Sequence, residues 1–373
     1  MSRSDMLLIG CGGCGNNQLN ELLNRSRRYN GLFFNTNIRE MEDLDNFDID
    51  RRCFYIPSAD GTGKNRSLTE MYIKEEAPKF AESMSGFKNA NMITILSSAN
   101  GGTGSKAATL FPSMIYGLIQ HGMMKLKSLS LITTFPSLDE SFIDFENTID
   151  YWNEMLEAVD DDFINNVTFI DNEKYNEKEI NNYLASDFNN IFDMAEGKID
   201  NSDLDKYFQA KGYNFALRLN ESITNTRNAI ERAKDETIFF VPDDLQPSNE
   251  RSKMACDVMI ATVNINSHNP AELRSMVKGC TFQKINEVTE GDSFVIFGGC
   301  EIPTYPIDLI RDALRDMRLQ KRNRKNTKLS NLKVKDVFDD IEVKSNKEKE
   351  NKNVKPNIKS KDFDKIFDDD FWK

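Results

Sequence analysis

The fold is decided by one stretch, Ala99-Asn100-Gly101-Gly102-Thr103-Gly104-Ser105, which follows an apolar run at 91–96 and precedes a helical pattern at 105–120. Glycines let a backbone approach an oxyanion closely, and a helix N-terminus offers unpaired N–H groups. An ordinary tight turn does not explain five small or polar residues in series. The stretch therefore predicts a strand, a phosphate-binding loop and a helix.

A second glycine-rich loop, Gly10-Cys11-Gly12-Gly13-Cys14-Gly15-Asn16-Asn17, follows the apolar run 6–9. Alone it satisfies G-x-G-x-x-G, the fingerprint of dinucleotide-binding folds. Those folds place a carboxylate at the end of the next strand, where it binds the ribose, but here that strand ends Phe34-Asn35-Thr36-Asn37. Two loops suit a nucleoside triphosphate, and a nicotinamide-dependent oxidoreductase is the alternative from another class.

Composition limits the remaining classes of protein. The chain has 373 residues, enough for about two domains, and a net charge of -12, which disfavours direct DNA binding by its body. No apolar run reaches the roughly 20 residues that cross a bilayer, and we expect no signal peptide. Six irregularly spaced cysteines predict reduced thiols and a cytoplasmic protein.

Strand and helix patterns alternate over the first 170 residues, which predicts an α/β fold with a parallel sheet. Apolar residues at three- and four-residue spacing predict one long helix over 202–233. A second unit follows, and its last helix is expected from Pro306 to about Arg324. Few large apolar residues occur beyond 325, so we expect a tail without a packed core.

The loop 101–105 is similar to the signature of the tubulin/FtsZ superfamily, and the resemblance continues in order along residues 6–310. The loop 10–16 resembles the first loop of that family, and 61–65 falls where its γ-phosphate-sensing loop belongs. Asn35-Thr36-Asn37 resembles the second loop, normally Asn-Thr-Asp, so Asn37 replaces an Asp associated with metal-bound water. The chain most resembles the divergent TubZ-type plasmid and phage partition tubulins.

This resemblance implies four regions: a GTP-binding parallel-sheet domain at 1–201, a long central helix at 202–236, a smaller α+β activation domain with a terminal helix at 237–324, and a flexible tail at 325–373. It also implies GTP or GDP and Mg²⁺ as ligands. The nucleotide-binding residues that it implies are Gly12, Gly13, Cys14, Asn16, Asn17, Asn35, Asn37, Gly61, Gly63, Lys64, Asn100, Gly101, Gly102, Thr103, Gly104, Ser105, Glu140, Asn172, Phe208 and Asn214.

In this family, acids in a loop after the long central helix reach the nucleotide of the next subunit. The resemblance places that loop at 241–250, with Asp244 as the first candidate, Asp243 as the second and Glu250 as the third. The alternative is that Asp243 and Asp244 only form a turn and cap a helix, a common role for Asp.

The resemblance further implies a GTPase that is activated by head-to-tail assembly into filaments and segregates DNA through a DNA-binding adaptor of TubR type. An FtsZ-like division protein or a phage-centring tubulin is the alternative within the family. Two tail peptides, Val337-Phe338-Asp339-Asp340 and Ile366-Phe367-Asp368-Asp369, share an apolar-Phe-Asp-Asp pattern. We interpret them as docking peptides, against the alternative of a solvated spacer.

Overall fold

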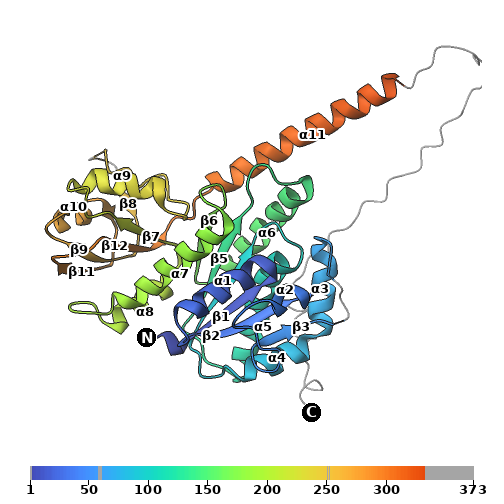
Figure 1. Cartoon of the computed structure of the whole chain (residues 1–373), viewed down its shortest axis with the longest axis horizontal. Coiled ribbons are helices and arrows are strands. Elements are labelled where there is room, and N and C mark those ends of the chain that lie inside the picture. The colour runs from blue at the N-terminus through green and yellow to red at the C-terminus, as the bar shows by residue number, and fades with distance from the viewer. Residues whose placement is uncertain (1, 58–60, 250, 252, 332–373) are drawn as a thin grey trace, which may run out of the picture. The chain divides into compact units, whose positions relative to one another are not determined.

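The computed structural model describes residues 2–57, 61–249, 251 and 253–331. A ten-stranded sheet covered by helices dominates it (Figure 1), so the predicted α/β class is confirmed. The strands of this sheet are β1 (Met6–Cys11), β2 (Asn30–Asn35), β3 (Cys53–Tyr55), β4 (Met92–Ser98), β5 (Ser128–Phe135), β6 (Asn166–Asp171), β7 (Gly212–Leu219), β9 (Val258–Asn264), β11 (Phe282–Val288) and β12 (Ser293–Cys300).

The α-helices are α1 (Gly12–Arg25), α2 (Arg39–Glu42), α3 (Arg66–Glu75), α4 (Ala77–Ser85), α5 (Thr103–Gln120), α6 (Phe142–Asp160), α7 (Glu177–Asp193), α8 (Asn201–Gln209), α9 (Thr226–Glu236), α10 (Pro270–Ser275) and α11 (Tyr305–Asn331). A 3-10 turn, η1 (Arg3–Asp5), precedes β1, and β8 (Met254–Ala255) pairs with β10 (Val277–Lys278) in a small second sheet. Among the described residues, no helix is both long and apolar enough to cross a bilayer.

Seven adjacent strands of the large sheet are parallel, in the order β7-β6-β5-β4-β1-β2-β3. Every residue of β1 and β5 is buried, as expected for parallel strands covered on both faces. The carboxyl ends of these strands lie at one edge, where ligands bind in open α/β sheets. Both glycine-rich loops begin at this edge, after β1 and β4.

Helices pack on opposite faces of the sheet. On one face α1 contacts α7, and Tyr29 packs against Phe188 of α7. On the other face α5 contacts α3 and α6, and its Phe111 packs against Phe34 and Phe54 of the sheet. The loops that connect strands to α1 and α5 are therefore held between two packed layers.

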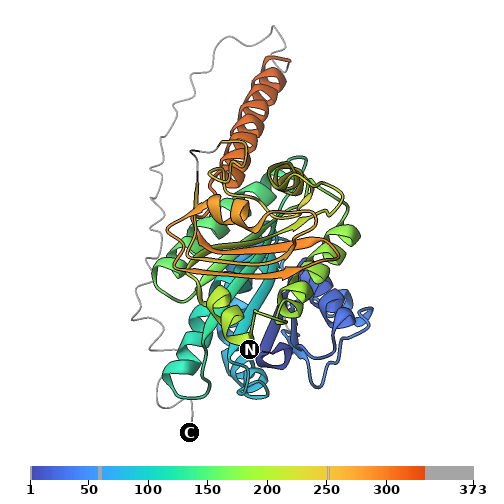
Figure 2. The same ribbon diagram turned by 90° about the vertical axis from the view of Figure 1, so that its left-hand side faces the viewer.

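The C-terminal strands extend the same sheet with a change of direction. β12 is antiparallel to both β7 and β9, while β11 is parallel to β9. Figure 2 shows β9, β11 and β12, in orange, side by side.

The prediction of one long helix over 202–236 is wrong. The chain forms α8, strand β7 and α9 there. Gly212 starts β7 with a φ of +121°, a value outside the helical range. The prediction failed because Phe215 and Leu219 fit a helical spacing of four and also a strand spacing of two, with Leu217 between them.

A long helix, α7, lies earlier in the chain, between β6 and α8. Asn176 caps its N-terminus, since its side chain accepts a hydrogen bond from the Glu179 N–H and Glu179 bonds back. Its buried residues Ile180, Leu184 and Phe188 recur every four positions and face the sheet.

The C-terminal helix is longer than predicted, because α11 runs from Tyr305 to Asn331 and not to Arg324. The chain divides into two compact units, Met1–Asp312 and Ala313–Lys373. Both Phe-Asp-Asp peptides of the tail lie outside the described residues.

Candidate functional site

A cavity of about 280 Å³ lies at the carboxyl edge of the parallel strands. It is lined by the loops after β1, β2, β3 and β4, namely by Gly12, Gly13, Asn35, Thr36, Asn37, Glu40, Gly61, Thr62, Gly63, Lys64, Ser98, Gly101, Gly102, Thr103 and Gly104. Both glycine-rich loops and the two loops between them therefore share one cavity. Sequence reasoning omitted four of these lining residues: Thr36, Glu40, Thr62 and Ser98.

Three of the four omissions had a signal. Thr36 and Thr62 stand inside loops already implied by the resemblance, and Ser98 ends the strand before the loop 99–105. Glu40 had none, because its place in the cavity depends on how the chain turns between Asn37 and α2.

The two glycine-rich loops touch at positions where only glycine fits. A Cβ on Gly12, whose φ is +70°, would lie 2.9 Å from the Gly104 nitrogen, and a Cβ on Gly104 would collide with the Cys11 carbonyl oxygen. A Cβ on Gly102 would lie 2.7 Å from backbone atoms of Lys64. The close approach leaves room for a phosphate chain to reach backbone N–H groups.

Two helices begin at this cavity, α1 at Gly12 and α5 at Thr103, and neither has an acidic residue in its first turn. Helix N-termini carry unpaired N–H groups and the positive end of the helix dipole. The cavity is thus suited to an anion such as a phosphate.

Three threonine hydroxyls meet beside the start of α5. The Thr103 Oγ1 lies 2.8 Å from the Thr36 Oγ1 and 3.2 Å from the Thr62 Oγ1. They come from the loops after β2, β3 and β4. The cluster therefore joins these three loops at one point.

Lys64 brings a cation to the cavity. The residue has a φ of +65°, and its ammonium donates to the Asp144 Oδ1 at 2.5 Å. Asn100 also donates to that oxygen, at 3.2 Å. Burial disfavours the charged form of Asp144, but hydrogen bonds from Lys64 and Ser141 outweigh it and hold the pKa of the carboxyl below its usual value.

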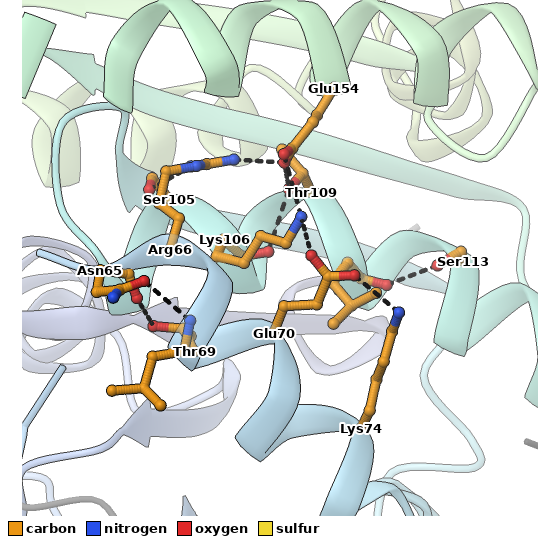
Figure 3. A network of polar contacts seen from close by, with 12 residues as sticks. Asn65, Arg66, Thr69, Glu70, Lys74, Ser105, Lys106, Thr109, Ser113 and Glu154 are labelled. Carbon is orange, nitrogen blue, oxygen red and sulfur yellow. Dashed lines mark hydrogen bonds and ion pairs between the residues drawn. The ribbon is translucent and has the colours of Figure 1, made fainter. Parts of the chain in front are cut away.

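A charged network lies behind the loop 99–105 (Figure 3). Ser105 donates to the Gly101 carbonyl and accepts from Arg66, whose guanidinium also pairs with Glu154. Lys106 pairs with Glu70 at 2.7 Å and Glu154 at 3.0 Å. Lys106 therefore points into this network, which ties α3, α5 and α6 together.

The remaining predicted residues of the first loop lie on α1, where Asn17 contacts α7 and Asn16 contacts β2. The Asn17 Nδ2 donates to the Glu177 Oε1 at 2.8 Å, and the buried Asn16 donates to the Phe34 carbonyl at 3.1 Å. Burial raises the pKa of the Cys14 thiol to about 11. Cys14 and Cys11 are both free thiols.

Two further predicted residues lie near the carboxyl ends of β5 and β6. Glu140 precedes α6, and its pKa is raised by burial and by the nearby Asp144 carboxylate. Asn172 directly follows β6. Neither lines the cavity at the carboxyl edge of the parallel strands, which is called the phosphate cavity below.

The structure does not bring Phe208 and Asn214 to this site. Both line a separate internal cavity together with Tyr207. Asn214 is 1% exposed; its Nδ2 donates to the Tyr207 carbonyl and its Oδ1 accepts from the Gly299 N–H. These contacts make Asn214 a structural residue of the interior, and the guanine contact predicted for it had relied on the helix that is absent.

Asp243 and Asp244 lie in the loop between α9 and β8. The Asp244 Oδ2 accepts from the Ala255 N–H at 3.1 Å, and Glu250 lies outside the described residues. They were chosen because a long helix was expected to end at 236, so the correction of that helix removes the support for this loop.

The loop that does follow a long helix is 194–200, between α7 and α8. It lies at the amino edge of the sheet: Arg3, before β1, pairs with Asp193 at the end of α7, and Lys127, before β5, pairs with Asp205 of α8. The phosphate cavity is at the opposite edge. Asp200 is exposed in this loop and caps α8 by accepting from the N–H groups of Ser202 and Asp203.

The cavity suits a hard divalent cation such as Mg²⁺ by the chemistry of its donors, which are the threonine hydroxyls and the Glu40 carboxylate. Among the described residues, no group of three His, Cys, Asp or Glu side chains could hold a metal alone. Mg²⁺ on a nucleotide needs few protein ligands, because phosphates and water supply the others.

Comparison with protein families matches residues 5–179 to the Tubulin/FtsZ family, GTPase domain. The tubulin-like protein TubZ of Clostridium botulinum C phage is 24% identical over 351 residues, 92% of each chain. The solved structure of the tail-truncated TubZ of Clostridium botulinum phage c-st has a TM-score of 0.73 at 20% identity and covers 85% of this chain and 99% of its own. A GTPγS-form protofilament of TubZ from Bacillus thuringiensis serovar israelensis has a TM-score of 0.69 at 17% identity, with 87% and 94% covered.

Proposed function

Residues 5–179 form a GTPase domain of the tubulin/FtsZ family, and from this premise we propose that the chain binds and hydrolyses GTP and assembles head to tail into filaments that move plasmid or phage DNA. One observation carries the proposal: the two glycine-rich loops meet at Gly12 and Gly104, with the Thr36, Thr62 and Thr103 hydroxyls beside that contact. This arrangement suits the phosphate chain of a nucleoside triphosphate.

In the proposed complex, the N–H groups at the starts of α1 and α5 bind the phosphates, and Thr103 faces the γ-phosphate. Lys64 supplies positive charge from the third loop. Thr36 and Thr103 would hold Mg²⁺ here, and the cation would supply positive charge to the phosphates. Catalysis of this kind depends on positioning and electrostatic stabilisation.

Assembly completes the site in this proposal. A head-to-tail stack brings the amino edge of one subunit to the phosphate cavity of the next. Two carboxylates of the loop 194–200 are exposed at that edge, Glu196 and Asp200. We assign to Asp200, which directly precedes α8, the role of orienting the attacking water in the neighbouring subunit. Two solved structures that this chain resembles in fold are a two-stranded TubZ filament and a TubZ protofilament.

The DNA-moving role rests on the similarity to the phage protein TubZ and on the composition of the C-terminus. Residues 315–335 contain nine Lys and Arg against the single acid Asp316. A DNA-binding adaptor of TubR type is the proposed partner of this region and the tail. Truncation after Asn331, which retains α11 and most of the basic residues, should leave GTP binding unchanged and weaken co-sedimentation of the adaptor with filaments.

The proposal is tested by light scattering and phosphate release after addition of GTP. Gly104→Ala forces the two loops apart and should abolish both signals. Gly86→Ala is the matched control, because its Cβ would meet nothing closer than the Ser83 oxygen at 3.5 Å. NAD binding by the wild-type protein without any response to GTP would instead identify the dinucleotide-binding alternative.

A further inference from the structure

Glu40 is the one carboxylate among the residues that line the phosphate cavity. It belongs to α2 and approaches the first loop so closely that a Cβ on Gly13 would lie 3.2 Å from its Oε2. Its Oε2 accepts from the Asn35 Nδ2 at 2.8 Å and its Oε1 accepts from the Asn37 Nδ2 at 3.2 Å. Two asparagines of the second loop therefore hold this carboxylate at the wall of the cavity.

A carboxylate in this place is unfavourable for a phosphate ligand alone. Like charges a few ångströms apart repel, and this repulsion persists at Glu40 although solvent weakens it, because the Glu40 side chain is exposed. Glu40 also competes with the anion-binding N–H groups at the start of α1. The unfavourable interaction becomes favourable when a divalent cation lies between the carboxylate and the phosphates.

The neighbouring residues are consistent with a cation. Asn37 is neutral, so the second loop contributes no negative charge of its own. The hydroxyl cluster of Thr36, Thr62 and Thr103 lines the same cavity. Carboxylate and hydroxyl oxygens are the protein ligands that Mg²⁺ accepts beside phosphates and water.

We propose that Glu40 is the residue of this chain that recruits the nucleotide-bound divalent cation, either directly or through its bound water. The inference rests on the proposed function, because it presumes that the cavity binds GTP. In this inference, Glu40 supplies the negative charge that Asn35-Thr36-Asn37 does not carry. It makes nucleotide affinity depend on the cation in a way that a neutral residue at position 40 weakens.

The opposing explanation is that Glu40 only orients Asn35 and Asn37. The two explanations predict different nucleotide binding when no metal is present. An orienting residue, once removed, weakens nucleotide binding equally with and without a cation. A cation-recruiting carboxylate, once neutralised, weakens binding with the cation and strengthens it without, because the repulsion is relieved.

The experiment measures equilibrium binding of a fluorescent GTP analogue to the full chain in Mg²⁺ and in EDTA, for wild type, Glu40→Gln and Glu42→Gln. Glu42 is the matched control, because it is exposed on the same helix and does not line the cavity. We expect Mg²⁺ to strengthen wild-type binding, and Glu40→Gln to reduce that strengthening about tenfold while binding more tightly than wild type in EDTA. Glu42→Gln should behave as wild type.

A second readout is electron paramagnetic resonance of Mn²⁺, which measures how tightly the nucleotide complex binds the metal. We expect the Mn²⁺ affinity to be weaker in Glu40→Gln than in the wild type. Equal losses of affinity in Mg²⁺ and EDTA, or an unchanged ratio between them, would overturn the inference. Absence of GTP binding by the wild-type chain in both buffers would instead overturn the proposed function. Thermal unfolding of the two variants checks that each is folded.

Discussion

The Lys64 ammonium lies 2.5 Å from the Asp144 carboxylate, while the same lysine lines the phosphate cavity. Asp144 is fully buried, whereas the Lys64 side chain is 45% exposed. The Asp144 carboxylate is therefore enclosed by the protein, and the Lys64 ammonium is accessible to a ligand. A γ-phosphate entering the cavity competes with Asp144 for the same ammonium.

Lys64→Gln should weaken GTP binding more than GDP binding. A charge-assisted hydrogen bond contributes about 1.5–3 kcal/mol, so the loss for GTP should be roughly ten- to a hundredfold, with little change for GDP. Isothermal titration with both nucleotides measures the difference. Lys88→Gln, at an exposed lysine outside the cavity, is the control, and equal losses for GTP and GDP would refute γ-phosphate sensing by Lys64.

Arg66→Met should destabilise the fold. Arg66 is 7% exposed and supports both Ser105 and Glu154. Because Glu154 is 32% exposed, the loss should be smaller than the about 3–5 kcal/mol of a fully buried ion pair. Urea unfolding measures the loss of free energy of unfolding. Arg27→Met, at an exposed arginine, should change it by no more than about 0.5 kcal/mol, so similar values for the two variants would contradict a structural role of the network.

Asp200→Ala should polymerise with GTP but hydrolyse it at least about tenfold more slowly, so its filaments should persist longer. Sedimentation and phosphate release are the measurements. A mixture of Asp200→Ala and Thr103→Ala subunits should recover part of the turnover, because some interfaces then join an intact cavity to an intact Asp200. Slow hydrolysis by Asp244→Ala together with normal hydrolysis by Asp200→Ala would return the trans-acting acid to the loop 241–250.

His268 should make stability depend on pH. Its Nδ1 accepts from the Ser293 hydroxyl at 2.7 Å, and its Nε2 donates to the Ile223 carbonyl at 3.1 Å. Burial lowers the pKa of the imidazole below its usual value despite these hydrogen bonds. The unfolded chain, with a pKa of about 6.5, then binds a proton more readily than the folded chain.

The stability from neutral His268 is therefore fully present above about pH 6.5 and is lost as pH falls from there through the lower folded pKa. Thermal unfolding at pH 7.5 and 5.5 should show a drop in Tm that is smaller in His268→Gln. The same drop in His268→Gln as in wild type would show that other groups cause it, and His121→Gln tests the second histidine.

Sequence reasoning brought the two glycine-rich loops to one site, and they do line one cavity, because their signal is local. The positions of Gly12, Gly102 and Gly104 follow from a backbone requirement that no other residue meets. It placed Phe208 and Asn214 on one helix because the spacing of Phe215 and Leu219 also fits a helix, whereas the pairing of β7 with β6 and β12 makes this segment a strand. The same helix prediction placed the expected trans-acting acid in the loop 241–250, because that residue was located by its distance from a helix, whereas we propose the loop 194–200.

The 17 residues of α7 span about 25 Å at 1.5 Å per residue. At its start Glu177 accepts a hydrogen bond from Asn17 of α1, and at its end Asp193 pairs with Arg3. In the proposed stack, one helix thus contacts a subunit's own nucleotide-binding half and leads into the loop that meets the neighbour's nucleotide. Within that proposal, the nucleotide site of one subunit and that of its neighbour both lie at the ends of the same helix, so a change at either site reaches the other through α7.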